Sequence, residues 1–177
     1  MQRIPPWRAY RLLHPKMVTV IGAAHEGRVN FMPASWVMPV SFDPPLIAAA
    51  IGSERYTLEL VRGSGEYTVN PVSADMLDTV MRLGAASGRT MDKAGIARPA
   101  AALEVGAPCL EGALGCIEAR VEKLVEAGDH VLAIARVVAA RAWRCFDTSS
   151  FMYREGCGPV YHAGGDTFML PGRLVRA

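Results

Sequence analysis

Two consecutive segments in the second half of the chain constrain the fold most, because together they have the pattern of a β-hairpin. Between residues 117 and 125 apolar and charged residues alternate, and residues 130–143 form a long, mostly apolar run. Alternation with a period of two predicts a strand that has one face toward solvent. Gly128-Asp129 is a turn signal between the two segments. The sequence therefore predicts an antiparallel strand pair, which favours a β-rich fold.

Similar patterns predict further strands and two short helices. Prolines 33, 39, 44 and 45 exclude a helix over residues 33–45 and predict an extended, largely buried segment there. The connections are too short for repeated crossover helices, so the strands should pair antiparallel. The predicted fold is mainly β (α+β), a small barrel with helices inserted between strands and one domain over residues 1–177. Strands are expected over 17–21, 29–32, 46–51, 66–70 and in a tight hairpin over 161–169, and helices over 53–61 and from residue 73.

Composition excludes several other classes of protein. With 51% apolar and 20% charged residues, the 177-residue chain has enough apolar surface for its own core, which excludes a disordered chain. The net charge is only +2 and no basic cluster occurs, which argues against a nucleic-acid or anionic-membrane partner. No apolar run reaches 18 residues and no good secretory signal is present, so we expect a cytoplasmic protein. Its four cysteines form no C-x-x-C pair and are expected to be unpaired, with no redox role: Cys109, Cys116, Cys145 and Cys157.

The start of the first predicted helix is a candidate phosphate site. Unpaired N–H groups at a helix N-terminus attract anions, and Ser53, Arg55 and Thr57 add two hydroxyls and a guanidinium. Lys93, in a glycine-flanked loop, is a second candidate cation. The alternative is an ordinary helix capped by Ser53 or Thr57, with the basic residues in solvent.

Other candidate residues lie near the proline-rich segment and at the predicted barrel rim. Trp36 in a stiff extended loop can flank a planar heterocycle, or it can belong to the core. Asn30, Ser35 and Ser41 are polar groups in an apolar neighbourhood and need hydrogen-bond partners, from the ligand or from the backbone. His130 follows a turn. No H-E-x-x-H, P-loop or G-x-G-x-x-G motif occurs, so a metal site and a Rossmann domain are not expected. These residues alone predict a barrel with a possible site for a planar phosphorylated ligand.

The segment over residues 30–46, NFMPASWVMPVSFDPPL, resembles the hallmark of the flavin reductase-like, FMN-binding split-barrel family. Further motifs follow in the family's order and extend the resemblance over residues 14–170. They are Ser53-x-Arg55-x-Thr57, GEYTVN at 65–70, the loop at 88–93, APCL at 107–110, Gly128-Asp129-His130 and the hairpin at 161–168.

The resemblance implies a homodimer in which each subunit binds one FMN near the interface. It places Asn30, Ser35 and Trp36 against the flavin, together with the Pro39-Val40-Ser41 backbone. Ser53, Arg55, Thr57 and Lys93 match positions that bind the phosphate. His130 matches a histidine near the ring and is the candidate catalytic residue, while Phe168 or Tyr161 would close the far side.

The residues of this hallmark segment are most similar to those of flavoredoxin-like and archaeal ferric reductase-like members of the family. The expected function is an oxidoreductase that passes electrons from NADH or NADPH through bound FMN to a small-molecule or protein acceptor, such as a flavin, a ferric complex or a redox partner. The alternative is an FMN-bearing electron-transfer protein without its own NAD(P)H activity. A third possibility is a barrel that holds no flavin. The flavin would carry the redox chemistry, which agrees with the absence of a catalytic triad.

Overall fold

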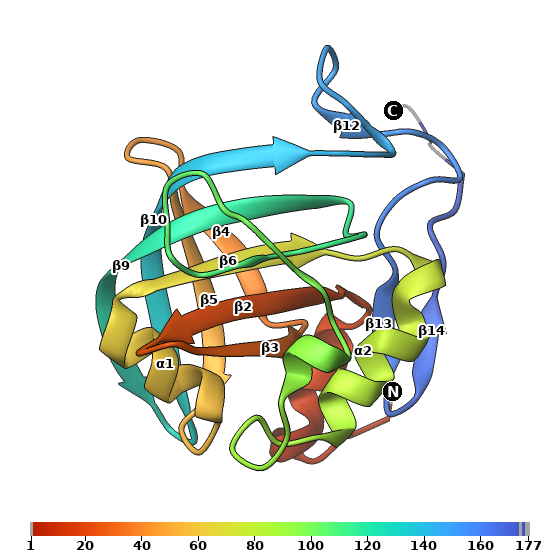
Figure 1. Cartoon of the computed structure of the whole chain (residues 1–177). Helices are drawn as coiled ribbons and strands as arrows, with labels where there is room; N and C mark the ends of the chain where they lie inside the picture. The colour runs from red at the N-terminus through yellow and green to blue at the C-terminus, as the bar shows by residue number, and fades with distance from the viewer. Residues whose placement is uncertain (1, 174, 176–177) are drawn as a thin grey trace.

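Seven antiparallel strands form the main sheet of the computed structural model, which describes residues 2–173 and 175 (Figure 1). The predicted domain of 1–177 also includes residues 1, 174, 176 and 177, which lie outside the described residues. The sheet has the order β3-β2-β6-β9-β10-β5-β4 and curves into a split barrel. Its strands are β2 (Thr19–His25), β3 (Arg28–Ala34), β4 (Val37–Ser41), β5 (Leu46–Gly52), β6 (Glu66–Pro71), β9 (Gly115–Ala127) and β10 (His130–Ala142).

The predicted hairpin is confirmed as β9 and β10, the two longest strands of the sheet. They pair from His130 opposite Ala127 to Ala142 opposite Gly115, with irregular register near Ala135 and Ala139. Such irregularities increase local twist, which helps a long hairpin to bend around a barrel. β10 also pairs with β5 along seven residues and so places His130 opposite Gly52.

The barrel is open between β3 and β4, the two edge strands of the sheet. These strands are consecutive in the chain, and only Ser35 and Trp36 join them. Pro39 fits an edge strand because it has no N–H to donate to a further strand. The expectation that this segment is largely buried is wrong: Met38 and Val40 are exposed, because one side of β4 has no neighbouring strand in the described chain.

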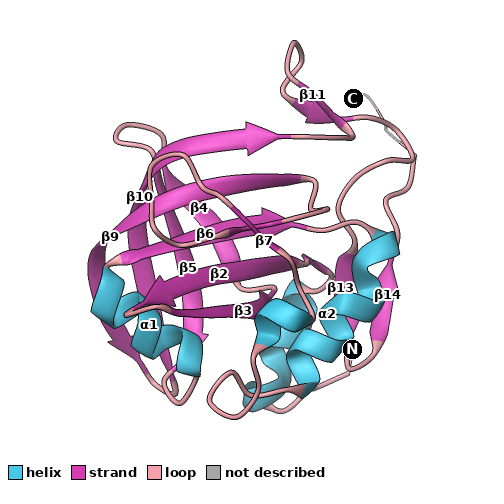
Figure 2. Cartoon of the chain, in the orientation of Figure 1, coloured by secondary structure: helices cyan, strands magenta, loops and turns pink. Residues whose placement is uncertain are grey.

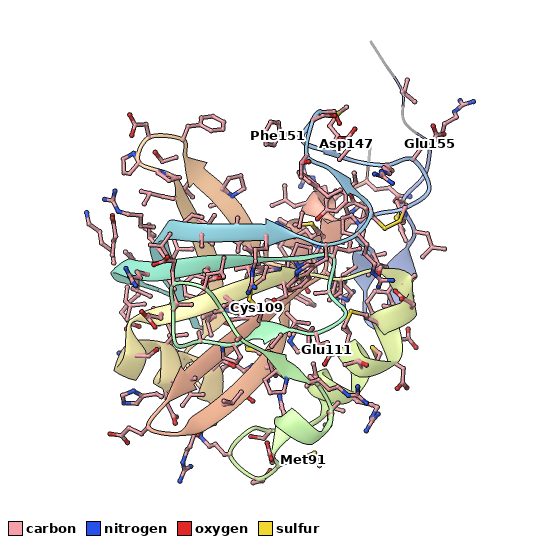
Figure 3. The ribbon with its side chains drawn as sticks, turned by 45° about the horizontal axis from the view of Figure 1, so that its top comes forward. Met91, Cys109, Glu111, Asp147, Phe151 and Glu155 are labelled. Carbon is pink, nitrogen blue, oxygen red and sulfur yellow. A yellow bond between two sulfur atoms is a disulfide. The ribbon has the colours of Figure 1, made fainter. Side chains whose placement is uncertain are left out.

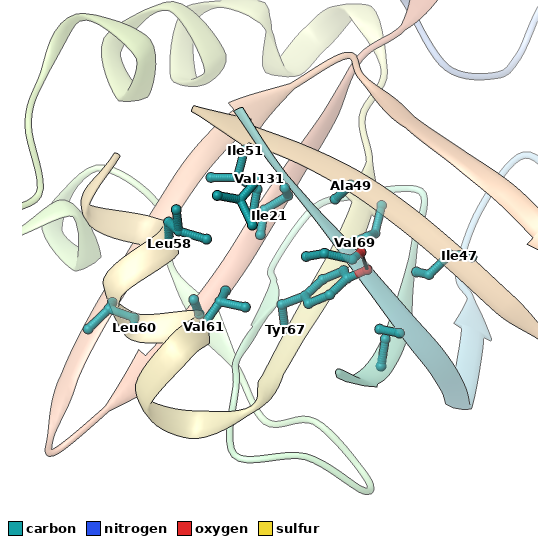
Figure 4. Packing of buried hydrophobic residues seen from close by; sticks show 14 of the residues in the cluster. Ile21, Ile47, Ala49, Ile51, Leu58, Leu60, Val61, Tyr67, Val69 and Val131 are labelled. Carbon is teal, nitrogen blue, oxygen red and sulfur yellow. Dashed lines mark hydrogen bonds between the residues drawn. The ribbon is translucent and has the colours of Figure 1, made fainter. Parts of the chain in front are cut away.

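Helix α1 (Tyr56–Ser64) covers one end of the barrel and completes its core (Figure 4). Leu58 and Val61 point from the helix toward Tyr67 and the aliphatic side chains of β2, β5 and β10. The predicted helix is confirmed, but neither Ser53 nor Thr57 caps it. Its N-cap residue is Arg55, which makes no side-chain capping bond, and it ends at Gly65 in the left-handed conformation.

A second core lies on the other face of β2 and β3, beneath helix α2 (Leu77–Ala85). Figure 2 shows α2 beside the small sheet of β1 (Lys16–Met17), β13 (Tyr161–Gly164) and β14 (Thr167–Met169), which contains the predicted C-terminal hairpin. None of the described helices is both long and apolar enough to span a membrane. The remaining elements are η1 (Pro6–Leu13), η2 (Ala74–Met76), η3 (Lys93–Gly95), β7 (Pro99–Ala100), β8 (Cys109–Leu110), β11 (Phe146–Asp147) and β12 (Met152–Tyr153).

The prediction of unpaired cysteines is wrong for the structure. Cys109 is bonded to Cys116 and Cys145 to Cys157, and no free cysteine is present among the described residues. The first disulfide is buried and joins β8 to β9; Figure 3 shows Cys109 within the body of the molecule. The second closes the projecting loop that carries Asp147 and Phe151 (Figure 3). The paired cysteines are 7 and 12 residues apart, spacings that match no C-x-x-C motif, so the sequence alone did not indicate these pairs.

Candidate functional site

A cleft of about 460 Å³ opens where β3, the start of α1 and the start of β10 meet. Its wall on the β3 side runs from Asn30 to Trp36, and the loop after α2 forms the opposite wall. Because the two edge strands separate after Ala34, the cleft begins where the barrel is open. The volume lies within the usual range for small-molecule sites.

One wall of the cleft carries a buried amide with an unused acceptor. Asn30 is only 2% exposed, and its Nδ2 donates a hydrogen bond to Thr57 Oγ1 over 2.7 Å. Its Oδ1 is buried without a partner. A Cβ added at Gly88 would lie 2.2 Å from this Oδ1, so the loop can approach the amide only because residue 88 is glycine. Buried acceptors are normally paired, so this oxygen indicates a ligand that donates a hydrogen bond.

Positive charge converges on the same end of the cleft. Arg55 stands at the uncapped N-terminus of α1, where backbone N–H groups face outward. Lys93 is 4% exposed, and its ammonium donates to the carbonyl oxygens of Leu83 (2.8 Å) and Phe31 (3.2 Å). Burial lowers the pKa of Lys93, and the nearby positive charge of Arg55 lowers it further. Two cations that repel each other beside a helix N-terminus are groups that an anion would pair with.

Arg89 is a further cation of the cleft, and sequence reasoning missed it. Its guanidinium donates to the carbonyl of Glu54 (2.9 Å), forms an ion pair with Glu59 and lies over the ring of Tyr56. Arg89 thus connects the loop after α2 to the first turn of α1. Its position next to Gly88 in the glycine-flanked loop was the only sequence signal.

Aromatic side chains line the other end of the cleft. The rings of Trp36 and His130 stack with their centroids 4.9 Å apart and their planes 26° from parallel. Tyr10 of η1 meets the indole edge-on. His130 Nδ1 is 2.6 Å from Asp129 Oδ1, and this hydrogen bond is the main reason that the pKa of Asp129 is lowered. Since a carboxylate only accepts, the proton lies on Nδ1 and leaves Nε2 as the other hydrogen-bonding atom of the ring.

The structure brings seven of the predicted site residues to this cleft and leaves five away from it. Ser53 instead donates to the backbone oxygen of Asp129 (3.1 Å). Phe168 lies in a neighbouring pocket, and Tyr161 lines neither space. The residues in the cleft are Asn30, Ser35, Trp36, Arg55, Thr57, Lys93 and His130; those away from it are Pro39, Val40, Ser41, Ser53 and Phe168.

The chain is similar in sequence and in structure to known proteins. The chain is 39% identical over 135 residues to an uncharacterised protein of Aeropyrum pernix, covering 73% of this chain and 51% of that protein, so it spans about half of that relative's length. It is 33% identical over 125 residues to the NADH-dependent flavin reductase StyB of Pseudomonas fluorescens, covering 69% of each. An FMN-binding protein from Thermus thermophilus, solved with bound 1-cyclohex-2-enone, is 29% identical and superposes with a TM-score of 0.86, covering 100% of this chain and 96% of that chain.

The model of the flavin reductase like domain matches residues 10–158. This match spans all seven strands of the main sheet, both α-helices and every residue of the cleft. The chain therefore belongs to the flavin reductase-like family.

Proposed function

We propose that this protein binds FMN in the cleft and transfers electrons from NADH or NADPH to an acceptor. The observation that carries the proposal is the buried, unpartnered Oδ1 of Asn30 beside a cationic helix N-terminus. A ligand that suits both the unpartnered oxygen and the cationic end presents a hydrogen-bond donor, such as a hydroxyl, close to an anionic group. The hydroxylated chain and terminal phosphate of FMN fit these two requirements.

The cationic end has the groups that a phosphate needs. Arg55 and Lys93 supply two charges, and the N-terminus of α1 supplies N–H donors. An arriving phosphate would relieve the repulsion between the two cations. Thr57 Oγ1 accepts the hydrogen bond of Asn30 Nδ2 and so orients the amide, while its hydroxyl hydrogen can still be donated to a phosphate. The anion specificity therefore rests on the cations, the backbone and this hydroxyl.

The aromatic end suits a planar ring system. Trp36 and Ser35 lie at the break in the barrel, where backbone N–H and C=O groups are not all used in a sheet ladder. The flavin, when bound, supplies the hydride and electron chemistry. The chain orients the ring, limits the access of water and, through the Asp129–His130 pair, holds a proton on Nδ1 of the imidazole. His130 is thus the candidate to hydrogen-bond the ring or the nicotinamide.

A homodimer is part of this proposal. β4 is an edge strand with exposed apolar side chains, and Phe42 just after it is 99% exposed. η1 adds Trp7 and Leu12, which are also exposed. Apolar patches next to an unpaired strand edge are typical of interfaces between subunits. The predicted cytoplasmic location and the identity of the acceptor stay predictions.

An absorbance spectrum of the purified protein, followed by FMN titration and anaerobic addition of NADH and then NADPH, tests the proposal. We expect FMN to bind with a flavin spectrum that bleaches on addition of a nicotinamide. If bound FMN bleaches only with dithionite, the protein is an electron carrier that depends on a redox partner. If FMN does not bind to the intact chain, the proposed function is wrong.

A further inference from the structure

A second pocket of about 350 Å³ lies directly beside the cleft. The two spaces share Pro33, Ala34 and Ser35 on one side and Gly84 and Ala85 on the other. The second pocket extends away from the cationic end, between α2 and the β13–β14 hairpin. None of Arg55, Lys93 or Arg89 lines it, so it has a different chemical character from the cleft.

The lining of this pocket is apolar. Val18 and Val80 form its floor, Met81 lies on the α2 side and Phe168 on the hairpin side. No acidic or basic side chain other than His162 lines it among the described residues. Such a lining favours a neutral, apolar ligand, because a charged ligand would lose its hydration without compensation. The volume is that of a small organic molecule rather than of a peptide segment.

His162 contributes a hydrogen-bonding group to the pocket, and the donor and acceptor nitrogens of its ring can be assigned. Its Nε2 lies 3.1 Å from the carbonyl oxygen of Gly165. A carbonyl only accepts, so Nε2 carries a proton and, in the neutral ring, Nδ1 is an acceptor. No described side chain or backbone group donates to Nδ1. The ring is held in place by its contacts with Phe168 and His14, both with centroids at 5.7 Å.

We propose that this pocket binds a small hydroxylated aromatic molecule, a phenol or naphthol, at the same time as the cleft holds FMN. The apolar walls and Phe168 accept the aromatic ring, and His162 Nδ1 accepts the hydrogen bond of the hydroxyl. The shared residues Pro33 to Ser35 place this ligand next to the cleft. The inference deepens the proposed function, since it assigns a substrate class to a site adjoining the proposed flavin site.

Calorimetric titration of 2-naphthol and of naphthalene into the FMN-loaded full chain tests the role of His162. The two probes differ only in the hydroxyl group. His162→Phe should weaken 2-naphthol binding about fivefold to tenfold, the effect of one hydrogen bond, and leave naphthalene binding unchanged. Equal losses for the two probes, or none, would overturn the assignment of the hydroxyl to His162.

Filling the pocket tests its location. Met81→Trp should abolish 2-naphthol binding while FMN affinity stays within twofold. Met152→Trp is the matched control, because Met152 is a similarly exposed methionine on β12, outside the pocket, and should change neither affinity. Binding of 2-naphthol that survives Met81→Trp would overturn the proposal.

Competition between the probe and FMN separates this inference from the proposed function. Simultaneous binding supports both. Displacement of 2-naphthol by FMN would show that the pocket is only part of the flavin site and would overturn the inference alone. Binding of 2-naphthol by a chain that does not take up FMN would support the pocket and overturn the proposed function.

Discussion

Thr57 Oγ1 accepts the hydrogen bond of Asn30 Nδ2 inside the cleft, and this contact fixes which way the buried amide faces. Asn30 comes from β3 and Thr57 from the first turn of α1. With Nδ2 engaged, Oδ1 lies buried beside Gly88, another residue of the cleft lining, without a partner. The position of α1 therefore decides that the acceptor oxygen of Asn30, and not its N–H₂ donor, is left for a ligand.

Removing the acceptor of this pair should weaken flavin binding. Thr57→Val keeps the shape of the side chain but leaves Asn30 Nδ2 without its partner, so the amide loses its fixed orientation. We expect riboflavin to bind about tenfold more weakly, the effect of one poorly made hydrogen bond, and FMN to lose at least as much, because its phosphate also loses the hydroxyl donor. Flavin fluorescence titration measures both constants. Unchanged affinities would show that Asn30 does not contact the flavin.

Gly88 should be intolerant of any side chain. A Cβ at this position would lie 2.2 Å from Asn30 Oδ1 and 2.8 Å from Tyr56 Cδ1, so Gly88→Ala must displace the loop or the amide. We expect a loss of FMN affinity of at least tenfold. Gly95→Ala is the matched control, because a Cβ there meets nothing within 4 Å. Similar FMN titrations for the two variants would contradict the close approach of the loop to Asn30.

FMN binding should weaken at alkaline pH through Lys93. Burial holds the pKa of Lys93 below its ordinary value of 10.5 in the ligand-free protein. A phosphate favours the protonated amine, so binding takes up a proton once the pH exceeds the lowered pKa, and the Kd then rises with pH. Titrations across this pH range should show the rise for FMN and not for riboflavin, which lacks the phosphate. A parallel rise for both flavins would assign the titration to another group.

The exposed edge near β4 should support self-association. Val40 and Phe42 are exposed apolar residues there, so the double variant Val40→Lys, Phe42→Lys places charge in the proposed subunit interface. We expect the wild-type chain to be dimeric by light scattering after gel filtration, and this variant to shift toward monomer. Leu103→Lys, an exposed leucine in another loop, is the control. A monomeric wild-type chain would refute the proposed dimer.

The two disulfides should contribute differently to stability. Cys109 and Cys116 are fully buried within the fold, whereas Cys145 and Cys157 close a projecting loop. Replacing the buried pair by alanine removes packed core atoms as well as a cross-link and should lower the free energy of unfolding by about 2 kcal/mol, while replacing the outer pair, which closes only a projecting loop, should change it much less. Urea unfolding under oxidising conditions measures both. Equal effects would mean that the outer loop unfolds together with the core.

Much of the fold could be predicted from the sequence because its strands carry strong local patterns. The alternation before Gly128 and the apolar run after it identify β9 and β10, and the structure confirms this hairpin. The anion site at the start of α1 was also inferred from local signals and stays a prediction, and the N-cap of this helix is Arg55 rather than Ser53 or Thr57.

The features that sequence reasoning missed depend on contacts that form only when the chain folds. Arg89 reaches Glu54 and Glu59 across the cleft, and no local pattern identifies such a contact. Cys109 and Cys116 are only seven residues apart, but their pairing was missed because the sequence does not show that the turn between them brings the two thiols together. The exposure of β4 was missed because an apolar sequence indicates that a segment is buried. It does not show whether residues of the same chain or of another chain bury it.

The gap between β3 and β4 makes the barrel an incomplete ring, joined at that point by Ser35 and Trp36 alone. A closed barrel would have a full ladder of hydrogen bonds at this point, whereas this chain has a cleft there. A ligand that binds only the folded chain adds about 2.7 kcal/mol of stability at a concentration 100 times its Kd. If the cleft binds FMN as we propose, resistance to heat and to proteolysis should rise and fall with the supply of flavin, and the abundance of the protein should follow that supply.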